Sequence, residues 1–152
     1  MIFNFTRVFG LWALVAPTAL AVGMRKLDGQ QYEDKCAGTT WEDKTSNESP
    51  LAEDCLKLAK QFENGHYGWF LNGATPDTYA ELGHVGTCGF GVEPVVKEGV
   101  KATNFFFGAA DLHDLVFDAT MRFRSQGGRI GATGVTQCDD TTVRWGVYHT
   151  PI

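Results

Sequence analysis

The ionisable side chains offer few arrangements that could do chemistry. The adjacent pairs Glu42-Asp43, Glu53-Asp54 and Asp139-Asp140 are not by themselves glycosidase pairs, because neighbouring residues in a strand point to opposite sides. Asp111 and Asp114 share one face of a predicted helix, where a solvated helix end explains them better than catalysis does.

The strongest isolated candidate for acid–base work is His149, which follows Tyr148. A lone histidine at the end of a strand is more often structural than catalytic. The sequence contains no Gly-x-Ser-x-Gly and no His-Glu-x-x-His motif. It therefore predicts no catalytic residue and no enzyme.

Residues 1–21 have the composition of a secretory signal peptide. One basic residue, Arg7, precedes an apolar core, and Ala19 and Ala21 form a small-x-small site with cleavage expected after Ala21. Pro17 and the short core argue against a membrane anchor, and no later stretch could span a bilayer. The sequence predicts a secreted, extracellular protein.

The mature chain is expected to be acidic. Cleavage removes Arg7 from the 13 Lys and Arg residues and none of the 18 Asp and Glu residues, which leaves 12 basic residues and a formal charge of −6. Nucleic acid and anionic membrane surfaces are therefore disfavoured as partners. The remaining length predicts one domain.

Four cysteines, Cys36, Cys55, Cys88 and Cys138, indicate two disulfides in an exported chain, and sequence alone allows three pairings. Their wide spacing, without a Cys-x-x-Cys, disfavours zinc, so no metal or cofactor is expected. We favour Cys36 with Cys138 and Cys55 with Cys88, because these bonds clamp the chain ends to a hairpin and the first helix to a strand. In the chain-entropy model they close loops of about 100 and about 34 residues and stabilise by about 4 to 5 kcal/mol each.

Residues 128–149 predict a β-hairpin. Alternate positions on each arm share one face. They are Ile130, Ala132, Gly134, Thr136 and Cys138 on the first arm, and Val143, Trp145, Val147 and His149 on the second. The opposite side carries Arg129, Thr133, Arg144 and Tyr148. One face of this hairpin should therefore be buried and the other exposed.

Two helices are predicted. The first runs to about Glu63, with Ser49 as its N-cap and Pro50 at its first position. Its buried stripe is Leu51, Cys55, Leu58, Ala59 and Phe62. The second covers residues 109–124, with a buried stripe of Leu112, Leu115, Val116, Ala119 and Phe123, and with Asp111, His113, Asp114, Asp118 and Arg122 facing water.

Short strands are predicted around Thr40, at 67–71, 78–82 and 85–92, and at the run Phe105–Phe107. Three glycines within 85–92 indicate that another backbone or a large ring packs closely over that strand. Residues 22–35 show no periodicity and predict a flexible leader before a single domain at 36–152. The order of elements predicts an α+β fold, a small disulfide-stabilised sandwich with an antiparallel sheet covered by two helices.

Four residues are candidate partner-binding contacts, although each also has a structural explanation: Arg129, Arg144, Tyr148 and Phe106. Asn47 begins an Asn-Glu-Ser sequon and is a candidate glycosylation site, whose use Pro50 should lower.

Several motifs, in order, resemble one family over residues 36–150. They are Cys36 with Thr39, Thr40 and Trp41, then SPLAEDC at 49–55, GTCGFGV at 86–92, the Asp-Leu-x-Asp-Leu helix at 111–115, GGRIGATGVTQC, and VRWGVYHT. This pattern resembles the fungal extracellular-protein-two effector family, also described as necrosis-inducing factors. One departure is Gly108-Ala109-Ala110-Asp111, where that family usually has Gly-Asn-Gln-Asp. Ala109 cannot cap a helix as Asn does, which costs about 1 kcal/mol if nothing replaces the cap.

The resemblance implies a cysteine-stabilised effector acting in the apoplast or at a host surface, where some members provoke plant cell death. The implied partner is a host extracellular protein or receptor, bound without catalysis. Members also occur fused to chitinases that look like killer toxins, and the layout is similar to a small α/β-sandwich killer toxin of smut fungi. An antifungal, killer-toxin-like or cell-wall-associated protein is therefore the alternative, and a hydrolase is a third.

Overall fold

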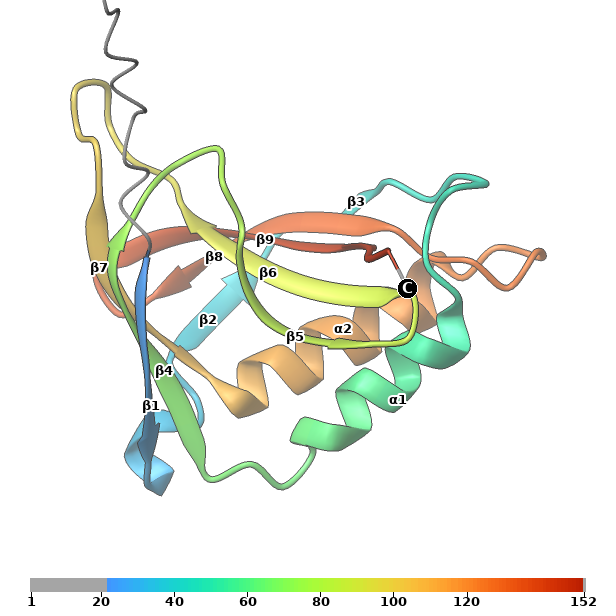
Figure 1. The fold of residues 1–152 in the computed structure, drawn as a ribbon, viewed down its shortest axis with the longest axis horizontal. Coiled ribbons are helices and arrows are strands. Elements are labelled where there is room, and N and C mark those ends of the chain that lie inside the picture. Colours follow the sequence, from blue (N-terminus) through green and yellow to red (C-terminus); the bar gives the residue numbers. More distant parts are fainter. Residues whose placement is uncertain (1–21, 152) are drawn as a thin grey trace, which may run out of the picture.

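The computed structural model describes residues 22–151 (Figure 1). The predicted signal peptide at 1–21 lies outside the described residues. Among residues 22–151, no helix is both long and apolar enough to cross a bilayer.

The described chain contains two α-helices, a short 3-10 helix and nine strands. In order they are β1 (Gly23–Asp28), η1 (Gln30–Tyr32), β2 (Cys36–Thr39), β3 (Glu42–Asp43), α1 (Ala52–Phe62), β4 (Tyr67–Ala74), β5 (Ala80–Val85), β6 (Cys88–Pro94), β7 (Thr103–Gly108), α2 (Ala109–Phe123), β8 (Ala132–Cys138) and β9 (Thr141–His149).

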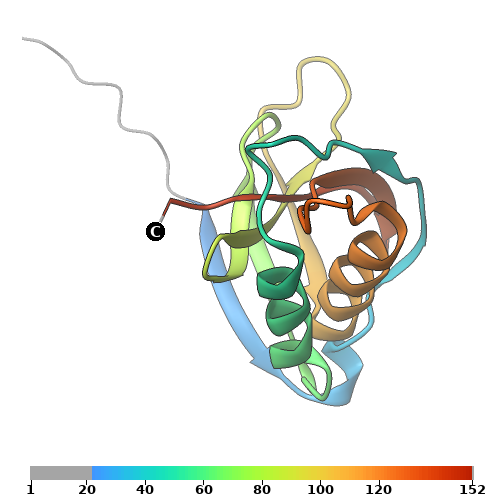
Figure 2. The same ribbon diagram turned by 90° about the vertical axis from the view of Figure 1, so that its right-hand side faces the viewer.

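The strands form two antiparallel sheets. The larger has the order β2-β8-β9-β6-β5, with β3 also paired to β8, and the smaller has the order β1-β4-β7. Helices α1 and α2 lie side by side against one face of the larger sheet, and the smaller sheet stands at one end (Figure 1; Figure 2). The predicted α+β sandwich is confirmed, with the strands divided between two sheets.

The predicted hairpin and both helical stripes supply the core. Trp145 of β9 is fully buried, and its ring lies 6.4 Å from that of Phe90 on β6. The ring of Phe90 lies 5.8 Å from that of Phe107 on β7, so aromatic contacts connect the two sheets. Ile130, Ala132, Thr136 and the other inward positions of the hairpin are also buried.

Two disulfides fix the chain to this core. The structure joins Cys36 to Cys138 and Cys55 to Cys88, the pairing favoured from the sequence. Cys36 and Cys138 are also register partners of β2 and β8, so the bond reinforces the edge of the larger sheet. The second bond ties α1 to β6.

The expectation of a leader without regular structure at 22–35 is wrong for Gly23–Asp28. These residues form β1 and pair antiparallel with β4, from Gly23 opposite Asn72 to Asp28 opposite Tyr67. The strand is mostly exposed and lacks the alternation that a half-buried strand shows. Hydrogen bonds between the backbones of β1 and β4 hold this strand in place. An alternating pattern of apolar and polar residues cannot reveal such pairing.

Helix α1 begins later than predicted, and Ser49 is not its N-cap. The N-cap position is Leu51, with no capping side chain. The Pro50 carbonyl accepts from the Ile130 amide, and the Leu51 amide donates to Thr87 Oγ1 over 2.9 Å. These contacts with distant segments keep residues 50–51 extended. Ser49 Oγ instead accepts from the Ser46 amide within the preceding turn.

Asp111 does not face water as predicted, since only 7% of its surface is exposed. It stands at the third helical position of α2, and its carboxylate accepts from the amides of Gly108, Lys35 and Cys36 over 2.8 to 3.1 Å. Gly108 is the N-cap residue, so Ala109 stands inside the helix. The carboxylate of Asp111 replaces the cap that Ala109 was expected to lack.

Candidate binding face

The exposed side of the larger sheet carries a row of residues that crosses five strands. Register pairs Glu81 of β5 with Gly91 of β6, Gly91 with Gly146 of β9, Gly146 with Thr133 of β8, and Thr133 with Glu42 of β3. Residues paired in this way point to the same side of a sheet. The two adjacent glycines leave a shallow trough between Glu81 and Thr133.

The ring of Tyr79, from the segment before β5, lies in this trough. A Cβ built at Gly146 would come within 2.8 Å of the Tyr79 ring, and one at Gly91 within 2.8 Å of Tyr79 Cβ. The Tyr79 hydroxyl lies 3.3 Å from Thr133 Oγ1 and 3.5 Å from the Trp145 carbonyl oxygen. Glycine at both positions is therefore what lets the ring lie against the backbone.

Tyr148 of β9 places a second ring beside the first. The ring centroids of Tyr79 and Tyr148 are 5.6 Å apart and their planes differ by 11°. A Cβ at Gly89 would come within 2.9 Å of the Tyr148 ring. The Tyr148 hydroxyl donates to Glu81 Oε2 over 3.3 Å, and burial together with the Glu81 carboxylate raises the pKa of Tyr148.

An ion pair borders the two rings. Arg144 of β9 donates to Glu93 Oε1 over 2.8 Å, and Glu93 is buried whereas the Arg144 side chain is 42% exposed. This hydrogen bond to Glu93 raises the pKa of Arg144 above its usual value. The pair fixes the guanidinium group at the edge of the face.

A hollow of about 560 Å³ is lined by Tyr79, Glu93, Thr133, Arg144 and Tyr148, together with Glu42 and Lys44 at its rim. Glu81 does not line this hollow and lies beside it, in contact with the Tyr148 hydroxyl. We call this surface the tyrosine face and define it by Tyr79, Glu81, Glu93, Thr133, Arg144 and Tyr148. It gathers two of the four predicted contact residues, Arg144 and Tyr148.

The other two predicted contacts lie elsewhere and have structural roles. Arg129 Nη1 donates to the Ser49 carbonyl over 2.6 Å and holds the segment before α1. Phe106 on β7 is partly covered by the rings of Tyr32, at 5.9 Å, and Phe70, at 4.9 Å. The structure does not bring either residue to the tyrosine face.

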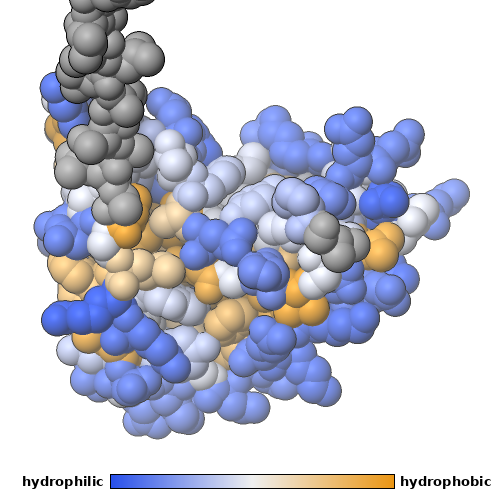
Figure 3. Space-filling model, in the orientation of Figure 1, coloured by the Kyte–Doolittle hydropathy of each residue, from blue (hydrophilic) through white to orange (hydrophobic). Residues whose placement is uncertain are grey.

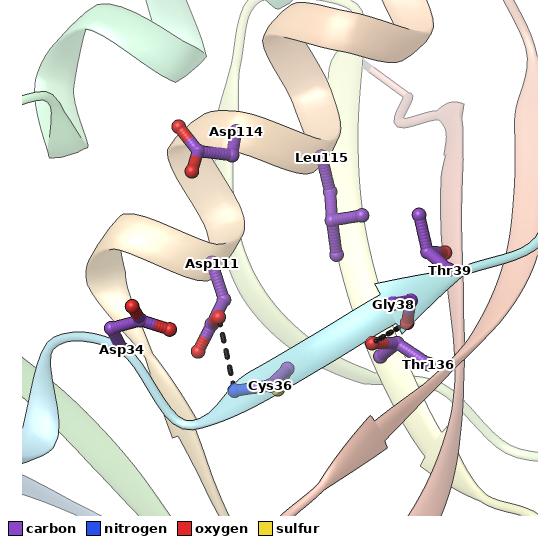
Figure 4. A pocket seen from close by; sticks show the side chains of 8 residues that line it. All are labelled: Asp34, Cys36, Gly38, Thr39, Asp111, Asp114, Leu115 and Thr136. Atoms are coloured by element: carbon purple, nitrogen blue, oxygen red, sulfur yellow. Dashed lines mark hydrogen bonds between the residues drawn. The ribbon is translucent and has the colours of Figure 1, made fainter.

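A second hollow, of about 240 Å³, lies between β2 and the N-terminal half of α2 (Figure 4). Asp34 and Asp111 lie at one end, Thr39 and Thr136 at the other, and Asp114 also lines it. Burial raises the pKa of Asp111 to about 7, against the opposing effect of its three amide donors. Since these donors occupy both carboxylate oxygens, Asp111 joins the start of β2 to the start of α2.

The remaining acid–base candidates are dispersed. His149 is exposed at the end of β9, where its register partner is Cys88. Asp54 is buried and accepts from the amide and hydroxyl of Thr87, and these hydrogen bonds lower its pKa. Among residues 22–151, no cluster of three or more His, Cys, Asp or Glu side chains could hold a metal ion. Asn47 lies exposed in the turn before α1.

Sequence reasoning missed Tyr79, the central residue of the tyrosine face. The sequence analysis included Tyr79 in a strand at 78–82, whereas the structure begins β5 at Ala80, so Tyr79 lies in the segment before that strand. The glycines of β6 predicted that another backbone or a large ring packs closely over that strand. The structure has the Tyr148 ring over Gly89, which the glycines alone could not identify. Thr133 was assigned to the exposed side of the hairpin, which its half-exposed position confirms.

Comparisons with known proteins identify a family and two similar proteins. A family model described as "pathogen effector; putative necrosis-inducing factor" matches residues 35–138, about two thirds of the chain. The match ends before β9, which supplies Arg144, Gly146 and Tyr148.

Two similar proteins come from Penicillium expansum. The protein named "Probable chitinase LysM18" is 33% identical over 118 residues, which is 75% of this chain and 8% of that protein. The protein named "Secreted chitinase LysM12" is 28% identical over 114 residues, 72% of this chain and 7% of that protein. The chain thus spans less than a tenth of the length of these relatives. On the extent of the family match, the chain belongs to the pathogen effector family of necrosis-inducing factors.

Proposed function

We propose that this protein is a secreted fungal effector that acts on a plant target by binding it through the tyrosine face, without catalysis. The observation that carries the proposal is the fixed pair of rings, Tyr79 and Tyr148, in parallel planes over a glycine floor. Rings already held in place lose little conformational entropy on binding. Membership of an effector family supports the biological role.

The scaffold beneath this face suits an extracellular protein. One disulfide joins β2 to β8 within the larger sheet, and the other fastens α1 to β6 of the same sheet. In the view of Figure 3, hydrophilic residues cover most of the surface, and hydrophobic residues gather towards the smaller sheet. A disulfide-bonded scaffold that presents the tyrosine face therefore supports the proposed extracellular binding role.

Catalysis finds less support. The acidic hollow contains three carboxylates, but Asp111, the one whose pKa is raised to about 7, is engaged by backbone amides. A general acid or base must reach the proton that it transfers. Asp111 is better explained as a positioning group for β2 and α2.

The second candidate function is a killer-toxin-like antifungal or cell-wall-associated role. The names of the two chitinase relatives favour it, because chitin is a wall polysaccharide. In that case the target would belong to a fungus and not to a plant.

The discriminating experiment applies the purified, disulfide-bonded chain 22–152 to leaves and to growing fungal cultures. Our proposal predicts cell death or a defence response in the leaf and unchanged fungal growth. Growth inhibition without a leaf response would favour the antifungal role. Hydrolysis of chitin that Asp111→Asn or His149→Ala abolishes would establish the enzyme instead.

A further inference from the structure

The tyrosine face has the features of a site for one chemical class of ligand. Its two rings have nearly parallel planes with centroids 5.6 Å apart, and both are held against backbone by glycines at positions 89, 91 and 146. The Tyr79 hydroxyl is turned to Thr133 and the Tyr148 hydroxyl to Glu81, so hydroxyl contacts lie at the edges of the rings. A flat apolar centre with a polar edge results.

The charges on this face are largely compensated within the protein. Arg144 pairs with Glu93 at 2.8 Å, and Lys44 at the rim pairs with Glu42. Glu81 is the remaining acid, and its Oε1 lies 2.6 Å from Nδ1 of His84. Neither a strongly anionic nor a strongly cationic ligand finds an opposite charge that is free of a partner here.

The size of the face also limits its occupant. Of the large hydrophobic side chains that are exposed in residues 22–151, only Tyr79 lines the hollow of about 560 Å³. A stable protein–protein interface buries about 800 Å² on each partner, and its apolar centre is made of several large side chains and not of one exposed ring. The hollow fits a narrow ligand with alternating apolar and hydroxyl surfaces better than it fits a protein.

We propose that the tyrosine face binds an uncharged oligosaccharide. The C–H faces of two successive sugar rings would lie over Tyr79 and Tyr148. Sugar hydroxyls would donate to Glu81 and to Thr133 Oγ1, whose own proton is donated to the Trp145 carbonyl over 2.6 Å. This inference rests on the proposed function, because it names the ligand class of the same binding face. Uncharged β-linked glycans occur in plant walls and in fungal walls, so the chemistry is shared by two sources.

The test is a titration of the isotope-labelled chain followed by NMR, with a cello-oligosaccharide, a chito-oligosaccharide and, as the anionic comparison, an oligogalacturonide. We expect saturable shifts with at least one uncharged sugar, confined to the amides near Tyr79, Gly91, Thr133, Gly146 and Tyr148. The sugar that binds identifies a plant-type or a fungal-type source. Absence of saturation by either uncharged sugar at millimolar concentration, or saturation by the oligogalacturonide alone, overturns the inference.

Variants localise the effect. Tyr79→Ala and Tyr148→Ala should each weaken binding about tenfold or more. Phe117→Ala removes an aromatic ring of similar exposure, 42% against 36% for Tyr79, from helix α2 and should leave affinity unchanged. The amide spectrum reports whether each variant is folded, and equal affinity of folded Tyr79→Ala and wild type contradicts the proposed site.

The inference and the proposed function can fail separately. If no uncharged sugar binds but the leaf response still requires Tyr79, the glycan inference is wrong and a plant protein becomes the ligand class of the face. If a sugar binds at Tyr79 but the leaf response does not require this residue, the glycan site stands and the proposed function is wrong.

Discussion

The ring of Tyr79 lies across Gly146, at a distance where even a single added methyl group would collide with it. A Cβ at position 146 would stand 2.8 Å from the ring and hydroxyl of Tyr79. This relationship connects two segments 67 residues apart in sequence and fixes the most exposed ring of the sheet face. The geometry of the proposed binding surface therefore depends on a residue without a side chain.

Gly146→Val should displace the Tyr79 ring and destabilise the protein by about 1 to 3 kcal/mol, as overpacking does. Valine suits a strand, so the loss would come from the collision with the ring. Urea unfolding measures the change. The control is Gly127→Ala, where the nearest atom to an added Cβ is 3.7 Å away, and the expected change is within about 0.5 kcal/mol. Equal stability of Gly146→Val and wild type would contradict the close packing described here.

Arg144→Ala should destabilise the fold by about 1 to 3 kcal/mol, because it leaves the buried carboxylate of Glu93 without its partner. The double variant Arg144→Ala, Glu93→Gln should recover part of this loss, since it removes the uncompensated charge. A double-mutant cycle by chemical denaturation measures the coupling. If the two single changes add without coupling, the ion pair does not contribute as proposed.

Removing the disulfides should give unequal losses. The Cys36–Cys138 bond spans 102 residues and the Cys55–Cys88 bond spans 33. In the chain-entropy model, replacing each pair by alanine costs about 5 and about 4 kcal/mol, respectively. Thermal unfolding of the two double-alanine variants checks the order, and a larger loss for the Cys55–Cys88 pair would oppose it.

Stability should fall as the pH rises between about 4 and about 7. Burial raises the pKa of Asp111 from the usual 3.8 to about 7 in the folded protein. The unfolded chain then holds fewer protons than the folded one in this window, so ionisation of Asp111 favours unfolding, by at most about 4 kcal/mol.

Asp111→Asn should remove this part of the pH dependence, as unfolding free energies at several pH values would reveal. Burial raises the pKa of Asp114 as well, so some dependence of the same sign should remain in the variant. The lowered pKa of Asp54 acts in the opposite direction, and only at pH values near and below 3.8. An identical pH profile for wild type and Asp111→Asn would show that Asp111 is not the responsible group.

The elements with strong periodicity could be predicted from the sequence. Helix α2 and the β8–β9 hairpin lie within a few residues of their expected bounds, because their buried faces are set by local spacing. Local signals failed where distant backbone groups compete. Ser49 and Pro50 look like a helix start, yet pairing with Arg129 and Ile130 keeps this segment extended.

In the tyrosine face too, residues set by local spacing could be predicted and residues set by distant contacts could not. The pattern of the hairpin placed Arg144 and Tyr148 on its exposed side, where the structure has them. Tyr79 could not be placed, because its position follows from glycines on two other strands and from a hydroxyl contact with Thr133. Asp111 was misplaced for a related reason, since its amide donors at Lys35 and Cys36 come from a segment 75 residues away.

The central claim, that the protein acts through the tyrosine face, is tested most directly by comparing dose and response in leaves. Leaves would be infiltrated with three proteins at matched concentrations, after circular dichroism has verified that each is folded. They are wild type, one double variant that carries both Tyr79→Ala and Tyr148→Ala, and the control Phe117→Ala. We predict that the double variant needs at least about tenfold more protein for the same response, and that Phe117→Ala matches wild type. Coinciding dose–response curves for the folded double variant and wild type would contradict the claim.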